Sequence, residues 1–208
     1  RQFGFQSIGI IRGEEHLPLN PTLREASEMG MELYYMDRAT YRNKHTEAVF
    51  DDLKDLFGEF YLVPEGGTNQ LALKGTAEIV ENIQADYDYF TASCGTGGTL
   101  AGIITGLKGK GSVLGFSALK GDFLEEEINQ LLNKSSSTVP DNWLVNNDYH
   151  FDGYAKYNMD LVYFMNEFSQ HHRILLDPIY TGKMMYGIMD LIKQEYFPPG
   201  ARILAIHT

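Results

Sequence analysis

The sequence is poor in cysteine, with Cys94 as its one representative among 208 residues. A lone cysteine cannot form a disulfide within the chain, and it excludes the paired-cysteine motifs of zinc and redox sites. The six histidines show no HExxH or similar ligand spacing, so no metal site is predicted. No apolar run approaches the roughly 20 residues that span a membrane, and no signal-peptide pattern opens the chain. These absences favour a soluble, cytoplasmic protein.

Basic residues are also scarce, with 17 Lys and Arg against 28 Asp and Glu, a formal net charge of −11. This charge would repel a phosphate backbone, so nucleic acid is excluded as a partner. Hydrophobic residues make up 43% of the chain, and 12 Phe and 13 Tyr are more aromatics than a disordered segment carries. The chain therefore has enough apolar material for a packed core of one large or two small domains.

Short apolar runs alternate with amphipathic stretches along the chain. The runs predict strands at residues 6–12, 32–37, 60–64, 87–92, 112–118, 143–147, 174–178 and 202–207. Helical periodicity predicts helices around residues 49–57, 100–107, 161–168 and 185–192, and helix-start signals stand at Asn20-Pro21, at Asp122 with Glu125, and at Asn158. The alternation predicts an α/β fold with parallel sheets covered by helices on both faces. Ligands in such folds bind at the carboxyl ends of the strands, and a domain boundary is expected near residues 60–67.

The strongest local signal is the run TASCGTGGTLAG at residues 91–102, where an apolar strand passes through glycines and threonines into a helix. Backbone amides, the helix N-terminus and the hydroxyls together form a phosphate-binding cup, with an ordinary glycine-rich turn as the alternative. Other motifs fail: no lysine follows as in a Walker loop, Leu100 replaces the last glycine of GxGxxG, and Thr91 replaces the first of GxSxG. Cys94 has no nearby histidine to activate it and is predicted to be a packed thiol.

A second strand-to-helix turn, LLDPIYTGK at residues 175–183, places Tyr180 and Thr181 at the mouth of the sheet. Tyr180 could serve chemistry or merely cover the core with its hydroxyl in water. Lys183 is interpreted as a surface residue at the start of a helix. Two further loops, PEGGTN at residues 64–69 and DGYAKYN at residues 152–158, could be functional or plain loops.

Together these turns resemble the D-cysteine desulfhydrase / 1-aminocyclopropane-1-carboxylate deaminase family. The glycine–threonine cup, the DPIYTGK turn, the Gly153-Tyr154 loop and the IHT run at residues 206–208 occur in the family's order. Residues 3–5, 11–15 and 20–23 match the family's smaller domain. The resemblance covers essentially the whole chain.

The resemblance implies the tryptophan synthase β-like fold, type II of the pyridoxal-phosphate enzymes, in a homodimer, with the N-terminal part of the fold outside this chain. Residues 1–62 would form part of the smaller αβα domain and residues 63–208 part of the larger, cofactor-binding one. Tyr154 and Tyr180 would lie beside a small amino-acid substrate, with Tyr180 positioning or protonating the reacting group. The residues that would hold pyridoxal 5'-phosphate are Gly95, Thr96, Gly97, Gly98 and Thr99 at the phosphate and Thr208 near the pyridine nitrogen.

The chain departs from the family in having no equivalent of the lysine that binds the cofactor covalently, nor of an Asn-containing loop near the cofactor ring. In the family both lie upstream of the segment that begins at Arg1. Neither Lys74 nor Lys183 falls at the matching position. We therefore expect this chain by itself to be inactive. A catalytically silent relative that binds pyridoxal phosphate or another phosphorylated ligand is one alternative that this absence raises.

Two positions bear on the choice of substrate. Family members that open the cyclopropane ring carry Glu after the active-site tyrosine and Leu in the final strand, whereas this chain has Thr181 and Thr208. The pair resembles the desulfhydrases and makes Thr181 a predicted specificity residue. The expected reaction is α,β-elimination from D-cysteine to pyruvate, ammonia and hydrogen sulfide. Ring opening of 1-aminocyclopropane-1-carboxylate to 2-oxobutyrate and ammonia is the other alternative.

Overall fold

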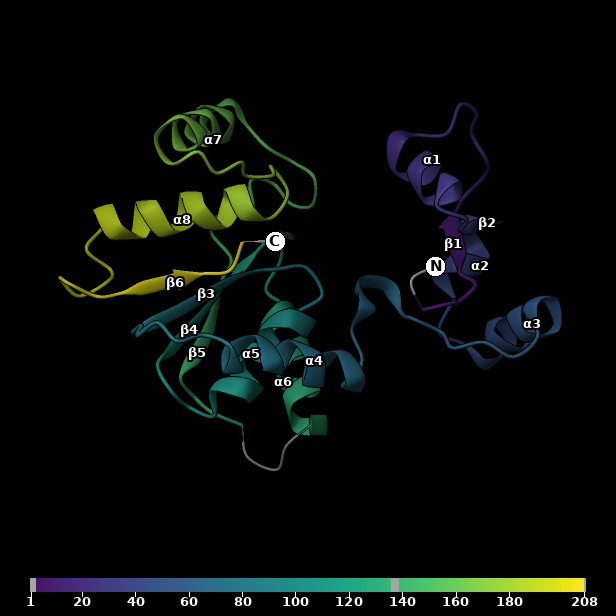
Figure 1. The fold of residues 1–208 in the computed structure, drawn as a ribbon, viewed down its shortest axis with the longest axis horizontal. Coiled ribbons are helices and arrows are strands. Elements are labelled where there is room, and N and C mark those ends of the chain that lie inside the picture. Colours follow the sequence, from purple (N-terminus) through teal and green to yellow (C-terminus); the bar gives the residue numbers. More distant parts are fainter. Residues whose placement is uncertain (1–2, 136–138, 208) are drawn as a thin grey trace. The chain divides into compact units, whose positions relative to one another are not determined.

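The chain divides into two compact units, Arg1–Leu62 and Val63–Thr208, in a computed structural model that describes residues 3–135 and 139–207 (Figure 1). Thr208, a predicted cofactor contact, lies outside the described residues.

The first unit is built on a two-stranded parallel sheet in which Ile8 pairs with Glu32. Its elements are β1 (Ile8–Arg12), α1 (Pro21–Glu28), β2 (Glu32–Met36), α2 (Arg38–Arg42) and α3 (Glu47–Phe57). The predicted start of α1 is confirmed, because Asn20 Oδ1 accepts a hydrogen bond of 3.0 Å from the amide of Leu23 and Pro21 occupies the first turn. A small core of buried side chains holds the sheet against α3: Met36, Val49 and Leu53.

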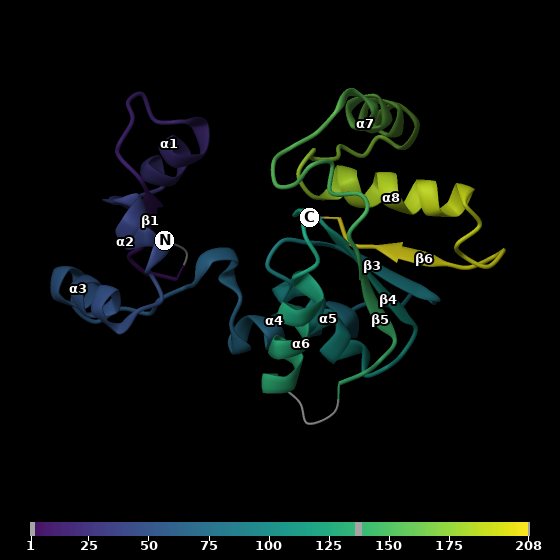
Figure 2. The same cartoon turned by 180° about the vertical axis from the view of Figure 1, so that it is seen from behind.

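The second unit contains a four-stranded parallel sheet in the order β5-β4-β3-β6. Its strands are β3 (Tyr89–Cys94), β4 (Ser112–Ser117), β5 (Trp143–Asn146) and β6 (Ile203–Ala205). A short 3-10 turn, η1 (Glu65–Gly67), precedes its helices, which are α4 (Gln70–Glu81), α5 (Gly98–Leu107), α6 (Leu124–Ser135), α7 (Met159–His172) and α8 (Thr181–Lys193). Helices α4, α5 and α6 lie on one face of the sheet and α7 and α8 on the other (Figures 1 and 2). The predicted alternation of parallel strands and covering helices is confirmed.

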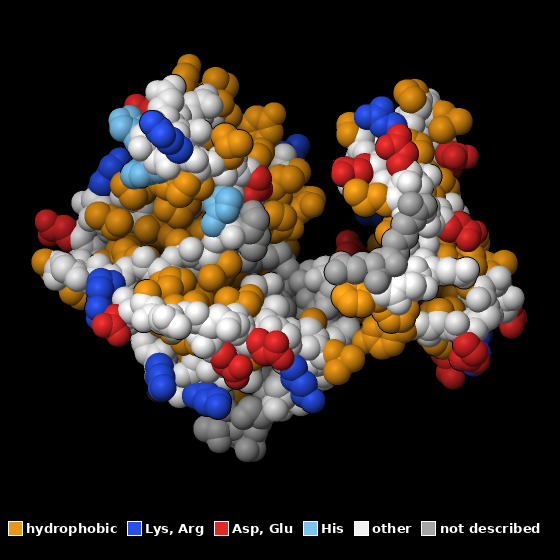
Figure 3. Space-filling view, in the orientation of Figure 1, with side chains coloured by type: hydrophobic (Ala, Val, Ile, Leu, Met, Phe, Trp, Pro, Cys, Tyr) orange, Lys and Arg blue, Asp and Glu red, His pale blue; other side chains and the backbone are white. Residues whose placement is uncertain are grey.

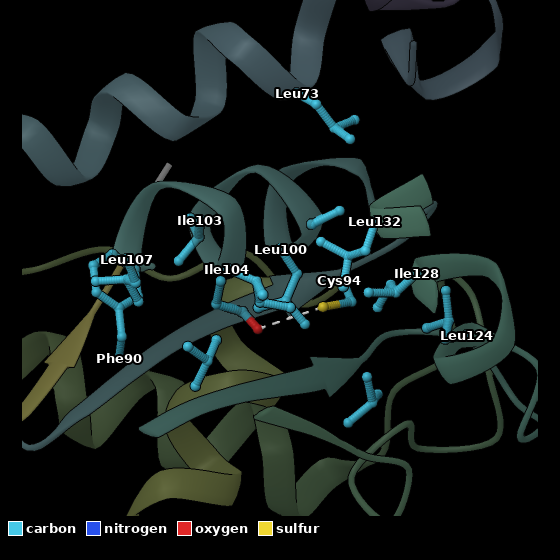
Figure 4. Packing of buried hydrophobic residues seen from close by; sticks show 14 residues of the cluster. Leu73, Phe90, Cys94, Leu100, Ile103, Ile104, Leu107, Leu124, Ile128 and Leu132 are labelled. Atoms are coloured by element: carbon cyan, nitrogen blue, oxygen red, sulfur yellow. Dashed lines mark hydrogen bonds between the residues drawn. The ribbon is translucent and has the colours of Figure 1, made fainter. Parts of the chain in front are cut away.

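The larger core lies between the sheet and the helices α4, α5 and α6 (Figure 4). Cys94, at the end of β3, is 2% exposed and lies among Leu100 and Ile128, with its thiol donating to the carbonyl of Ala92 at 3.7 Å. Burial raises the pKa of the Cys94 thiol to about 12. The prediction of a packed, unreactive thiol is confirmed.

Two predicted strands are wrong. Residues 60–64 form neither strand nor helix, and Tyr61 and Val63 are 67% and 64% exposed, since this segment connects the two units. Residues 174–178 are also outside the sheet: Leu176 is buried, but Leu175 is 79% exposed. The apolar runs predicted as strands are therefore a connector and a turn. Hydrophobicity alone does not supply a hydrogen-bonding partner strand.

The face drawn in Figure 3 shows hydrophobic side chains gathered over α7 and α8. Met159 and Tyr163 of α7 are 59% and 64% exposed, and Ile192 of α8 is 46% exposed. None of the helices in the described part of the chain is long and apolar enough to cross a membrane.

The predicted helix starts have different outcomes. Asn158 caps α7 as predicted, because its Oδ1 accepts a hydrogen bond of 2.9 Å from the amide of Leu161. Helix α6 begins at Leu124, one residue later than a cap at Asp122 requires.

Candidate functional site

A cavity of about 220 Å³ opens where β3 passes into α5. Residues 92–100 line it, together with Gly66, Tyr180 and Ile206. Gly97 precedes α5 with a left-handed φ of 76°, and no side chain of the described residues caps the helix. The first amides of α5 therefore lack an intrahelical acceptor and face an anion-binding position.

The glycines of this turn are required because other residues approach them closely. A Cβ on Gly97 would lie 2.6 Å from Ile128 Cγ1, and one on Gly98 would lie 2.6 Å from Thr68 Oγ1. A Cβ on Gly95 would come within 3.1 Å of the Tyr180 hydroxyl. The glycines thus do more than permit a tight turn: they let three other segments of the chain pack closely against it.

The loop at residues 64–69, which the sequence left open as a plain loop, forms one wall of this cup. Thr68 Oγ1 and Thr96 Oγ1 are 2.6 Å apart and share a hydrogen bond. Because only one of the two hydroxyl protons is used between them, the other remains available to a ligand. Thr96 and Thr99 are both exposed, so their hydroxyls can reach the cavity.

The opposite wall is the turn between Leu176 and α8, organised by Asp177. The Asp177 carboxylate accepts hydrogen bonds from the amides of Ile179 at 2.8 Å and Tyr180 at 2.7 Å, and from the Thr181 hydroxyl at 2.5 Å. Burial alone would raise the pKa of Asp177, but these hydrogen bonds outweigh it and hold the pKa below its ordinary value. The turn is therefore fixed around an ionised carboxylate.

Thr181, the predicted specificity residue, is fully buried and does not line the cavity. Its hydroxyl donates to Asp177 and accepts 2.9 Å from the amide of the same residue. Any influence of Thr181 on a ligand passes through the neighbouring Tyr180.

Tyr180 lines the cavity beside Gly95. Burial, with the neighbouring Tyr154 as a smaller cause, raises the pKa of Tyr180 to about 12, so its hydroxyl keeps its proton at neutral pH. Tyr154 is 56% exposed and meets Tyr180 edge to face, with ring centroids 6.1 Å apart. The structure thus places the two predicted catalytic tyrosines side by side, and of the two only Tyr180 is in the lining of the cavity.

The interpretation of Lys183 as a surface residue is wrong. Its side chain is 1% exposed, and its ammonium donates to the carbonyls of His150 and Gly153 at 2.8 Å each and of Ala118 at 3.4 Å. Burial lowers the pKa of Lys183, although the three carbonyls take up its hydrogen-bond donors. Lysine appears nowhere in the described lining of the cavity.

Comparison with known proteins identifies the family. The model of the family described as "Pyridoxal-phosphate dependent enzyme" matches residues 21–208. The chain belongs to this family. Pyridoxal phosphate is therefore its cofactor, as the sequence predicted.

Two relatives show which named enzymes of this family the chain is similar to. A putative 1-aminocyclopropane-1-carboxylate deaminase of Pyrococcus horikoshii is 28% identical over all of this chain and 67% of its own length. The mitochondrial bifunctional D-cysteine desulfhydrase/1-aminocyclopropane-1-carboxylate deaminase of Arabidopsis thaliana is 28% identical over 86% of this chain and 50% of its own length. The chain thus spans between half and two thirds of these relatives.

A solved structure described as an ACC deaminase homologue superposes on the whole chain with a TM-score of 0.78 and 26% identity. This chain covers 66% of that structure. The match confirms the predicted fold, two α/β units of the type II pyridoxal-phosphate enzymes, represented here over about two thirds of the relative's length.

The residues of the cup fit a phosphate group. The uncapped start of α5, the glycines at positions 95, 97 and 98, and the exposed hydroxyls of Thr96 and Thr99 provide donors and space without a competing carboxylate in the lining. Glycine-rich helix starts bind phosphate through such amides, so this lining is suited to the phosphate of the cofactor.

Proposed function

We propose that the full-length protein carrying this chain uses pyridoxal phosphate to deaminate a small amino acid by α,β-elimination, with D-cysteine as the preferred substrate. The observation that carries this proposal is the Tyr180 hydroxyl at the edge of the phosphate cup, held there by the Asp177 turn. With one water consumed, D-cysteine would give pyruvate, ammonia and hydrogen sulfide.

Residues 95–99 would hold the phosphate through backbone amides, with the Thr96 and Thr99 hydroxyls as additional donors. When bound, pyridoxal phosphate supplies the electron sink for the α-carbon of the substrate. The helix dipole of α5 would favour the dianionic phosphate over the pyridine-ring end of the cofactor and so fix which end enters the cup. Thr68 would orient the Thr96 hydroxyl from the second wall.

Tyr180 is the proposed acid of the reaction. Its raised pKa, about 12, keeps a proton on the hydroxyl oxygen throughout the physiological range. Negative charge develops on the sulfur as it leaves the substrate β-carbon as hydrosulfide, and the protonated Tyr180 phenol would stabilise that charge by donating a hydrogen bond to it. Tyr154 would bound the substrate on the far side of Tyr180 and limit its access to water.

The preference for D-cysteine rests on the environment of Thr181. This position is fully buried and its hydroxyl is hydrogen-bonded to the Asp177 carboxylate. A glutamate here would place a second carboxylate against Asp177, and like charges at such a distance repel. The turn therefore suits threonine, as in the desulfhydrase-like pair, and disfavours the glutamate of ring-opening relatives.

Two other functions each have an observation in their favour. Ring opening of 1-aminocyclopropane-1-carboxylate is favoured by the names of the two relatives. A catalytically silent, ligand-binding role is favoured by the absence of lysine from the described lining of the cavity. The same absence supports our proposal that this chain alone is inactive.

The deciding experiment offers the purified full-length protein both substrates. Release of sulfide and pyruvate from D-cysteine, without 2-oxobutyrate from 1-aminocyclopropane-1-carboxylate, is expected. Ring opening without sulfide release would replace the proposal with the deaminase function. Uptake of the cofactor, seen by its absorbance, without turnover of either substrate would establish the silent role.

Assembly and location belong to the same proposal. We expect a homodimer in the cytoplasm, with no nucleic-acid or membrane partner. Size-exclusion chromatography with light scattering on the full-length protein distinguishes a dimer from a monomer.

A further inference from the structure

Lys183 carries a buried positive charge that the proposed chemistry does not use. Its ammonium has hydrogen bonds to three backbone carbonyls, those of Ala118, His150 and Gly153, which come from two different loops. An ammonium has three protons to donate, so these carbonyls satisfy it fully. The contact ties the first turn of α8 to the end of β4 and to the loop that follows β5.

The loop that Lys183 holds has an unusual backbone. Phe151, Asp152 and Ala155, none of them glycine, have φ values of 50°, 67° and 55°, and Gly153 between them has 112°. Side-chain-bearing residues rarely adopt the left-handed region, and such conformations persist only where surrounding contacts impose them. The run of left-handed residues turns the carbonyls of His150 and Gly153 toward the ammonium.

Other contacts hold this loop less directly. The Tyr149 hydroxyl donates to the Asp190 carboxylate at 2.9 Å, which anchors the start of the loop two turns farther along α8. The exposed ion pair of Lys120 and Asp152, at 3.7 Å, is open to solvent and contributes little. The Nδ1 atom of His150 is buried without a hydrogen-bond partner. Within residues 150–154, Phe151 also meets Tyr186 of α8 edge to face, with ring centroids 5.1 Å apart. The Lys183 ammonium supplies the side-chain hydrogen bonds to the backbone of this segment.

We propose that Lys183 is a positioning residue: its ammonium holds the loop at residues 150–154 in its left-handed conformation and thereby sets Tyr154 against Tyr180. The two tyrosines come from different segments of the chain. Lys183 lies three residues after Tyr180, and its ammonium donates to the carbonyl of Gly153, the residue before Tyr154. A neutral side chain of equal length would remove the ammonium from all three carbonyls and leave those of His150 and Gly153 with only their backbone donors, the amides of Gly153 and Lys156.

The test uses the full-length protein with Lys183→Ala, and Lys193→Ala as the matched control, because Lys193 lies on the same helix but is exposed. Trypsin cleavage after the exposed Lys156, followed by mass spectrometry, reports the order of the loop without any need for activity. We expect Lys183→Ala to be cleaved there about 10-fold faster than the control. We also expect its kcat/KM to fall about 100-fold, the scale of a misplacement near 1 Å.

Chemical rescue of Lys183→Ala distinguishes a positioning role of the ammonium from a general contribution to the stability of the fold. Added propylammonium chloride, which supplies the missing stem and charge, should restore protection of Lys156 and part of the turnover, whereas sodium chloride at the same ionic strength should not. A folded Lys183→Ala protein that is cleaved at Lys156 no faster than Lys193→Ala overturns the proposal. So does a rise in cleavage that propylammonium leaves unchanged.

If Lys183→Ala does not fold, Gly153→Ala tests the same contact from the loop side. A Cβ at this left-handed position should displace the Gly153 carbonyl and produce the same rise in cleavage. Wild-type cleavage at Lys156 in Gly153→Ala would then overturn the proposal. The turnover measurement depends on the proposed function, but the cleavage measurement does not, so failure of one is distinguishable from failure of the other.

Discussion

At the scale of single residues, Asp177 fixes the turn that carries Tyr180, although it is not itself in the lining of the cavity. It accepts hydrogen bonds from three consecutive residues, one of which is Tyr180. The carboxylate therefore determines the backbone path that brings the tyrosine hydroxyl to Gly95.

Replacing Asp177 by Asn should lower the free energy of unfolding by about 1–2 kcal/mol at pH 7, since hydrogen bonds to a charged acceptor are lost. The pKa of Asp177 in the folded protein is below its ordinary value of 3.8. The carboxylate thus stabilises the fold fully above that value, and the contribution disappears as the pH falls through the lower, folded pKa. Urea unfolding of both proteins between pH 7 and pH 3 measures the difference, which should shrink only in acid. A difference independent of pH would contradict this account.

The Tyr180 hydroxyl is the residue-scale test of the proposed chemistry. Tyr180→Phe should lower kcat by about 10²–10⁴, the usual contribution of a general acid. Binding of the cofactor should persist, because the amides of residues 95–99 are untouched. Tyr163→Phe, at an exposed position on α7, serves as the control in the same sulfide-release assay. Full activity in Tyr180→Phe would remove the tyrosine from the mechanism.

At the scale of elements, the start of α5 depends on close packing by the 64–69 loop. Gly98→Ala would direct a methyl group at Thr68 Oγ1, 2.6 Å from the new Cβ, and should displace Thr68 from Thr96. We expect at least a 10-fold loss of cofactor affinity, measured by titration of the full-length protein with pyridoxal phosphate.

Gly75 provides the matched control for this substitution. It lies in α4 with nothing within 4 Å of a new Cβ, so Gly75→Ala should leave the cofactor affinity unchanged. It should also raise the free energy of unfolding by about 0.5–1 kcal/mol, the ordinary gain from replacing a helical glycine. Equal affinities in the two variants would show that the cup tolerates displacement of Thr68.

The elements of this fold were predictable to the extent that their signals are local. The glycine–threonine turn and the strand before it lie within a dozen residues, and the periodicity of α5 and α7 follows from adjacent turns. The contact of Thr68 with Thr96 joins residues 28 positions apart, and no local pattern encodes it. The segments at residues 60–64 and 174–178 have the composition of strands but do not pair with any strand of the sheet.

Lys183 was predicted to be a surface residue because lysine is usually exposed. Its spacing along α8 nevertheless indicated a buried position. It stands four residues before Gly187 and eight before Leu191, on the buried face of α8. A lysine in register with such a face must find acceptors inside the protein. The acceptors themselves, carbonyls 30 to 65 residues away, could not be read from the sequence.

At the scale of the whole molecule, the boundary between the two units is a segment without helix or strand. Tyr61 and Val63 on either side of Leu62 are largely exposed. Brief chymotrypsin treatment should therefore cut first after Tyr61, because proteases act on exposed, irregular backbone. Mass spectrometry of the earliest products checks this. First cleavage within α5 or β3 instead would mean that the second unit opens more readily than its connector.

The burial of Cys94 also makes its thiol a probe of how often the core around it opens. A thiol reagent cannot reach this sulfur until β3 separates from α5, so the labelling rate reports how often the floor of the cup comes apart. With one cysteine in the chain, every modified molecule marks the same event. Labelling of Cys94 with and without pyridoxal phosphate would then give the coupling between cofactor binding and core opening directly.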